Sequence, residues 1–147
     1  MSNGDRTRLI LPALAPVYRC ADAGAWPLLR VTCGLMLLPH GIPKFTNPAF
    51  AAAVTGLIGR LGFAPAVAWF WYVALLETVG GVMLALGLFT RPLALMVAIE
   101  MLVISFGVLL PAGRPYEFTL MWALLAFAIG WRGGGRWSLD RVIGWEF

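Results

Sequence analysis

The sequence predicts an all-α fold, namely a transmembrane four-helix bundle with a short interfacial C-terminal helix. Composition gives the first reason, because 61% of the 147 residues are apolar and 12% are charged, against about 45–50% and about 25% in soluble domains. A compact domain of this length exposes much of its surface, and this chain has too few polar residues to cover it. The composition therefore excludes a disordered chain, a disulfide scaffold and an ordinary soluble enzyme.

Four apolar stretches give the second reason, because each approaches or exceeds the length of about 20 residues that a helix needs to cross a bilayer. Proline and glycine mark the boundaries between them. The second stretch is the longest, and we expect it to tilt or to begin in the interface. The predicted spans are residues 26–45, 64–89, 92–110 and 116–131. We assign residues 26–147 to one transmembrane domain, and residues 1–25 to a cytoplasmic arm that lies partly on the membrane.

The C-terminal segment predicts a turn followed by a short helix. Gly133-Gly134-Gly135 lacks the GxxxxGK[ST] pattern of a phosphate-binding loop, so a tight turn after the last span is the better interpretation. Ser138 is placed to cap an amphipathic interfacial helix over residues 139–145, and Asp140 lies in the first turn of that helix. We regard Arg136, Ser138 and Asp140 as a structural motif.

The charge distribution predicts the orientation of the spans. The formal net charge is +4, but the arginines are scattered singly between apolar runs, so no nucleic-acid partner is expected. With four spans both termini lie on one side. That side carries seven basic residues near the spans and the other side carries three, so the positive-inside rule places both termini in the cytoplasm.

Several ionisable residues fall inside the predicted spans, where an unpaired charge is costly. At about 100° per residue, Arg30, Gly34, Leu37, Gly41 and Lys44 form one stripe of the first span, with His40 at its edge. This stripe is expected to face the centre of the bundle. The candidate cluster for a ligand or a proton consists of Arg30, His40, Lys44, Glu77, Glu100 and Glu117.

A second stripe, on the second span, contains Glu77, Gly80 and Gly81, and its glycines favour close approach of a neighbouring helix. By depth, Glu77 and Glu100 are the expected partners of Arg30, and Glu117 is the expected partner of His40 or Lys44. Two carboxylates cannot both pair fully with one arginine, so one of them is expected to hold a proton near neutral pH. Two interpretations stay open: a structural ion pair that fixes helix register, and a proton relay or ligand pocket.

The segment Pro39-His40-Gly41-Ile42-Pro43 predicts a kink in the first span. Each proline removes one helical hydrogen bond and frees the carbonyl four residues earlier, here those of Leu35 and Pro39. An imidazole beside free carbonyls could bind a water or the hydroxyl of a hydroquinone. A plain kink filled by a side chain is the alternative.

In their order and spacing, these residues resemble the DoxX family of small four-helix membrane proteins. The resemblance covers about residues 28–140, with Pro39 and Pro43 as departures from the family pattern. It rests on Arg30, Gly34, His40-Gly41, Lys44, Glu77, Gly80-Gly81, Leu86-Gly87-Leu88, Thr90-Arg91, Glu117 and the exit sequence from Arg136 through Trp137 and Ser138 to Asp140.

The resemblance implies a multi-pass protein of a bacterial-type inner membrane. It also implies membership of an oxidoreductase assembly, because family members are similar to a subunit of thiosulfate:quinone oxidoreductase and others are linked to a mycobacterial complex that handles thiol and oxidative stress. The chain has no CxxCH, dinucleotide fingerprint or metal-binding cysteine spacing, so no intrinsic cofactor and no metal are expected. The leading hypothesis is an oxidoreductase subunit that contacts a quinone. The alternative is a non-catalytic accessory subunit that stabilises a larger membrane complex, and a small transporter ranks last.

Overall fold

The computed structural model describes residues 11, 13 and 15–144, apart from the side chains at positions 19, 20, 22 and 23. These residues form helices and connecting turns, with no strand among them, so the predicted all-α class is confirmed. In chain order the elements are α1 (Ala15–Leu35), α2 (Leu38–Thr46), α3 (Pro48–Arg60), α4 (Ala66–Leu75), the π-helix η2 (Leu76–Gly80), α5 (Gly81–Leu86), α6 (Thr90–Val103), the π-helix η3 (Ile104–Leu109), α7 (Glu117–Arg132) and α8 (Leu139–Ile143).

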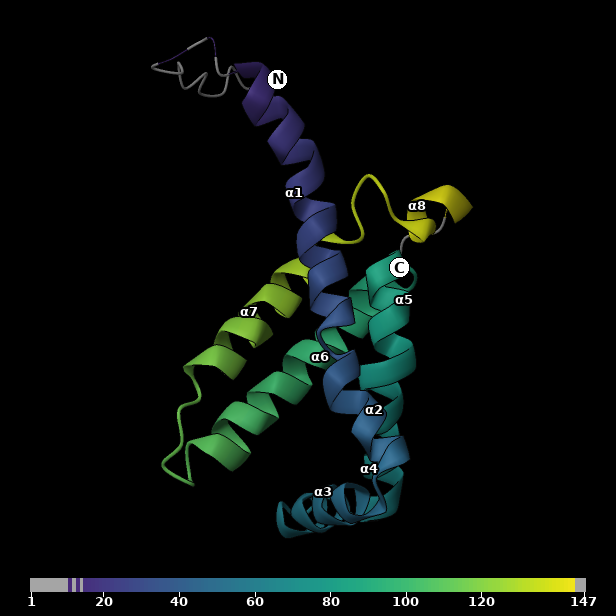
Figure 1. The fold of residues 1–147 in the computed structure, drawn as a ribbon, viewed down its shortest axis with the longest axis vertical. Helices are drawn as coiled ribbons and strands as arrows, with labels where there is room; N and C mark the ends of the chain where they lie inside the picture. The colour runs from purple at the N-terminus through teal and green to yellow at the C-terminus, as the bar shows by residue number, and fades with distance from the viewer. Residues whose placement is uncertain (1–10, 12, 14, 145–147) are drawn as a thin grey trace.

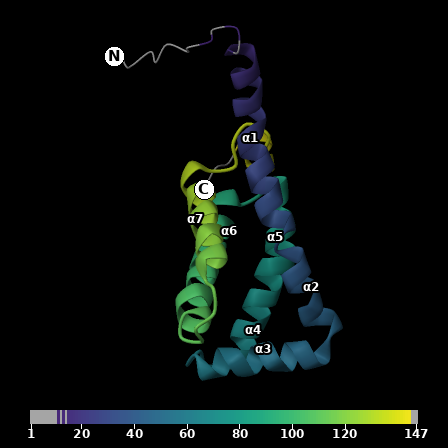
Figure 2. The same cartoon turned by 60° about the vertical axis from the view of Figure 1, so that its left-hand side comes forward.

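The elements assemble into four rods that follow the four predicted spans (Figure 1). The first rod is α1–α2, the second α4–η2–α5, the third α6–η3 and the fourth α7. Helix α3 lies across one end of the rods, and α8 lies at the opposite end; both views agree on this arrangement (Figures 1 and 2). By length and composition, the second and third rods contain helices that could cross a membrane, Ala66–Leu86 and Thr90–Leu109.

The outer faces of the rods are apolar. On the second rod, Leu75, Val79, Val82 and Leu86 recur at helical spacing and are 43–54% exposed. The third and fourth rods present similar apolar faces. Ile99 of the third rod and Leu124 of the fourth rod are each 61% exposed. Water would solvate such continuous apolar stripes poorly, whereas lipid acyl chains match them.

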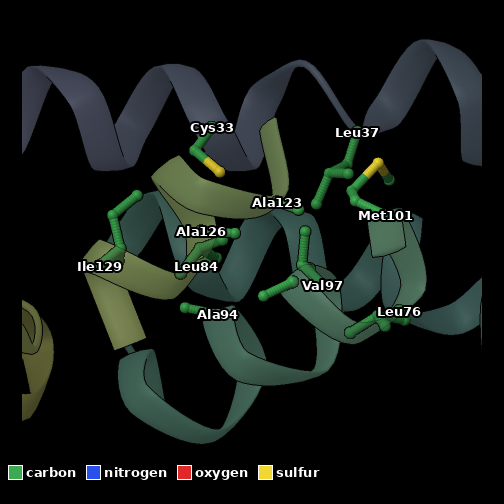
Figure 3. Packing of buried hydrophobic residues seen from close by; sticks show 11 residues of the cluster. Cys33, Leu37, Leu76, Leu84, Ala94, Val97, Met101, Ala123, Ala126 and Ile129 are labelled. Carbon is green, nitrogen blue, oxygen red and sulfur yellow. The ribbon is translucent and has the colours of Figure 1, made fainter. Parts of the chain in front are cut away.

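The inner faces pack around small residues. Ala94, Val97 and Ala98 of α6 meet Ala123 and Ala126 of α7, and all five are buried. Figure 3 shows Cys33 and Leu37 of the first rod closing this cluster from one side. Small side chains let the backbones of neighbouring helices approach closely, which is the main source of packing energy where lipid removes the hydrophobic driving force.

The crossing of α1 and α5 depends on two of the predicted glycines. A Cβ atom on Gly34 would lie 2.6 Å from the Ala85 backbone nitrogen, and one on Gly81 would lie 2.7 Å from the Gly34 carbonyl oxygen. The obstacles are backbone atoms, so neither helix could relieve the clash by a rotamer change. Gly41 makes a similar approach to η2, where an added Cβ would meet Thr78 Cγ2 at 2.6 Å.

The substitution Gly34→Leu is therefore expected to lower the free energy of unfolding in mild detergent by about 1–3 kcal/mol, the usual cost of overpacking. The matched control is Gly56→Leu on α3, where an added Cβ would approach only the flexible end of Arg60 at 3.5 Å. Thermal unfolding of both variants checks this expectation. Equal midpoints for the two would contradict the close crossing.

The first rod differs from its prediction at its start. Helix α1 begins at Ala15, whereas the sequence placed the start of the first span at Trp26. Residues 15–25 therefore extend the first rod beyond the bundle (Figures 1 and 2). Residues 1–10, 12 and 14 of the predicted arm lie outside the described residues.

The same rod is broken at Met36 and Leu37, and α2 begins at Leu38 with Pro39 as its second residue. At the break the Leu37 N–H donates to the Gly34 carbonyl at 3.3 Å, a tighter turn than an α-helix makes. Proline lacks an N–H and fits the first turn of a helix. The predicted kink is thus present as a break between α1 and α2, and Pro43 lies inside α2.

Candidate functional site

A cavity of about 390 Å³ lies where α3 crosses the end of the rods. Helix α3 starts there because the Asn47 side chain accepts a hydrogen bond from the Phe50 N–H at 3.1 Å and Pro48 occupies the first helical position. The wall is mostly apolar and contains aromatic side chains. Its apolar members include Val54, Leu57, Ile58, Val103 and Ile104, and Tyr72 is among its aromatic members.

The polar part of the wall is built on an ion pair between two rods. Lys44 of α2 and Glu77 of η2 are 7% and 3% exposed, and the lysine Nζ donates to Glu77 Oε2. Nζ also donates to the His40 carbonyl oxygen at 3.0 Å. The close approach of Gly41 to η2 brings Lys44, one turn further along α2, into reach of Glu77.

Glu100 of α6 completes the polar part. Its side chain lines the cavity, is 8% exposed, and accepts no hydrogen bond from an N–H or O–H group of the described residues at either carboxylate oxygen. The Glu77 and Glu100 carboxyl groups lie near enough to interact electrostatically. We call Lys44, Glu77 and Glu100 the polar triad.

Both π-helices adjoin this cavity. Glu77 lies on η2, and Ile104 and Val108 of η3 line the wall. At each site a hydroxyl bonds the carbonyl one turn earlier: Thr78 Oγ1 donates to Ala74 O at 2.6 Å, and Ser105 Oγ donates to Met101 O at 2.7 Å. Such bonds compete with the helical ladder, and π-segments of this kind are frequent at functional sites.

The other predicted site residues are not part of the buried triad. His40 is exposed, and its side chain lines the same cavity. Glu117 is exposed at the start of α7 and forms no ion pair with His40 or Lys44. The pairing of Glu117 with one of these residues is therefore wrong, and neither Glu117 nor His40 belongs to a buried cluster.

Arg30 is also placed differently from its prediction, since it pairs with neither Glu77 nor Glu100. Its side chain is 2% exposed and bonds the loop before α8, which lies at the opposite end of the bundle from α3 (Figure 1). The guanidinium donates to the carbonyl oxygens of Gly134 at 2.5 Å, Trp137 at 2.9 Å and Ala85 at 3.3 Å. Arg30 thus holds the C-terminal loop against the end of α5.

Asp140 completes this second site. Its carboxylate accepts hydrogen bonds from the Phe89 and Thr90 N–H groups at 2.7 and 2.9 Å, and so caps the start of α6. It also attracts Arg30 electrostatically. Ser138 caps α8 by accepting from the Arg141 N–H at 3.3 Å, as the sequence predicted, while Arg136 is exposed. These contacts join the loop to three rods and have a structural role.

Sequence reasoning missed α3 and therefore the wall that it supplies. The signal was present in Asn47-Pro48, a helix-capping residue followed by proline. It also missed the bond from Trp26 Nε1 to the Gly133 carbonyl oxygen at 3.0 Å, which fastens the C-terminal loop to α1.

Comparison with known proteins agrees with the resemblance drawn from the motifs. The DoxX family profile matches residues 25–110, more than half of the chain. An uncharacterized protein of Haemophilus influenzae is 29% identical over 120 residues, which cover 76% of this chain and 85% of that protein. No solved structure matches. The family match and the apolar outer faces together identify a membrane protein, and the chain belongs to the DoxX family.

Proposed function

We propose that this DoxX protein is a subunit of a membrane oxidoreductase complex and that it binds a quinone in the cavity beside α3. The observation that carries the proposal is the composition of the cavity wall, which is apolar and aromatic except for the polar triad, His40 and the hydroxyl group of Tyr72. Small-molecule sites commonly have this construction, with a volume of about 300–1,000 Å³ and a few polar groups that fix orientation.

The chemistry of a quinone suits this wall. Its ring and isoprenoid tail are apolar and reach the site through lipid, while its carbonyl oxygens accept hydrogen bonds, for which Lys44 of the wall supplies a donor. The family resemblance adds the link to a quinone-dependent complex. In this proposal electrons come from a partner subunit, and the present chain binds and orients the ligand.

The proposal includes a multi-pass arrangement in a bacterial-type inner membrane, with the four rods as spans and both termini in the cytoplasm. The apolar outer faces support it. It places α3 at the outer interface, and the cavity would open toward lipid near that surface. Arg91, Arg132 and Arg141 would then lie at the cytoplasmic interface, as the positive-inside rule requires.

Quinone binding is expected to fall at least about tenfold in Val54→Phe, because the larger ring occupies space in the cavity. Binding of a short-tailed quinone to protein purified in mild detergent measures this effect. The matched control is Val82→Phe on α5, whose side chain is 43% exposed and does not line the cavity. Equal binding by both variants, or no binding by the wild type, would overturn the proposal.

An accessory role is the second candidate, and one observation favours it. The first part of α1 extends beyond the bundle (Figures 1 and 2), and Val17 and Tyr18 there are 59% and 52% exposed. An extension of this kind offers a partner subunit a surface. Removal of the protein would then reduce the amount of the assembled complex but leave turnover per assembled complex unchanged, which quantitative co-purification with activity measurement can check.

A further inference from the structure

The buried Glu100 carboxylate restricts the kind of ligand that fits the cavity, beyond the requirement that the ligand be apolar. Glu100 is buried and lines the cavity, yet no N–H or O–H group of the described residues donates to its oxygens. A buried acceptor without a donor is costly, so a ligand that supplies a donor gains from it.

Lys44 provides the complementary group. Its ammonium has three N–H donors, of which one serves Glu77 and one serves the His40 carbonyl. The third makes no hydrogen bond among the described residues, and Nζ lies 5.8 Å from the centre of the Phe50 ring in the wall of the same cavity. Lys44 and Glu100 line the same cavity, and their charges attract each other. The wall thus presents both a donor and an acceptor to one ligand.

We propose that the cavity selects an apolar ligand that carries a hydroxyl group, with the hydroxyl hydrogen donated to Glu100 and the hydroxyl oxygen accepting from Lys44. A hydroxyl satisfies both groups, whereas a carbonyl or an ether oxygen can only accept and leaves Glu100 without a donor. Insofar as this inference rests on the proposed function, it identifies the reduced form, the hydroquinone, as the preferred ligand. The hydroxyl-bearing ligand class itself follows from the wall alone.

Two probe pairs separate these claims. The first pair is para-heptylphenol and its methyl ether, which differ in the hydroxyl donor and need no redox chemistry. The second pair is a short-tailed benzoquinone and its hydroquinone, measured without oxygen. Wild-type protein in mild detergent is expected to bind the phenol and the hydroquinone at least about tenfold more tightly than their partners, the usual effect of one unsatisfied buried group.

The variant Glu100→Gln tests the assigned residue. Its amide carries both a donor and an acceptor, so an ether or a quinone oxygen finds a partner there and the preference is expected to shrink to about twofold or less. Val82→Phe is the control that should keep the full preference, since residue 82 lies outside the wall. If Glu100→Gln does not fold, the wild-type comparison of phenol with ether decides alone.

The outcomes distinguish the two proposals. Equal affinity of the wild type for the phenol and its ether overturns the hydroxyl selection, and so does an unchanged preference in folded Glu100→Gln. Preference for the phenol combined with no binding of either quinone form overturns the quinone function and supports the hydroxyl selection. Failure of all four probes to bind overturns both.

Discussion

The substitution Arg30→Met is expected to lower the free energy of unfolding by about 3–5 kcal/mol. Arg30 is 2% exposed and donates to the carbonyl oxygens of Gly134, Trp137 and Ala85. Methionine fills similar space but donates nothing, so three carbonyls lose a donor and Asp140 loses its neighbouring cation. Thermal unfolding in mild detergent measures the loss. Limited proteolysis should show faster cleavage within the loop at residues 133–138.

Two further variants make this expectation specific. Arg114→Met removes an arginine from an exposed turn and should change stability by less than about 0.5 kcal/mol. Arg30→Lys keeps the charge but lacks the planar fork of donors, so its stability should lie between those of the wild type and Arg30→Met. Unfolding midpoints for Arg30→Met and Arg114→Met that agree within error would contradict the role of Arg30 as the anchor of the loop.

Helical periodicity predicted which faces of the rods are buried. The stripe from Arg30 through Gly34 and Leu37 to Lys44 is buried throughout, even though the rod is broken at Met36 and Leu37. The break preserved the stripe because the tight turn there leaves both helices against the second rod, at Gly81 and at Glu77. A helix face of small and charged residues is buried inside the bundle because charged groups are costly in lipid and small residues favour close packing of helices.

The partners of the buried charges were harder to predict. Similar depth in the membrane and opposite charge suggested that Arg30 pairs with Glu77. Arg30 instead donates to main-chain carbonyls. Every residue has such a carbonyl, so the sequence does not indicate which of them will be the acceptor. The return of the C-terminal loop to α1 is a long-range event, fastened by Trp26 to Gly133 across more than a hundred residues. Glu77, which Arg30 does not contact, forms its ion pair with Lys44 instead.

The cavity could not be predicted because it depends on α3. A search for spans passes over residues 48–60, which are too few to cross a bilayer. Their amphipathic pattern is weak, and their function in the fold comes from lying across the end of the rods rather than among them (Figure 2). Only that crossing turns the polar triad into part of a cavity wall.

The second large effect is expected for the ion pair itself. Lys44→Met should lower the free energy of unfolding by about 3–5 kcal/mol, because it leaves Glu77 buried beside Glu100 with no cation in contact. Glu77→Leu should also destabilise the protein, since it removes the carboxylate to which the buried Lys44 ammonium donates and leaves the His40 carbonyl as its hydrogen-bond acceptor among the described residues. Denaturant or thermal unfolding in mild detergent measures both losses.

The double variant Lys44→Met/Glu77→Leu should be more stable than the sum of the two single losses predicts, with a coupling energy of at least about 2 kcal/mol. Removing both charges abolishes the desolvation cost that each single variant leaves uncompensated, and two apolar side chains can pack in the space of the pair. Strict additivity would mean that the two side chains do not interact in the protein. Full recovery of stability together with loss of phenol binding would separate the fold from the function, because the apolar pair restores packing but cannot present a donor to a ligand.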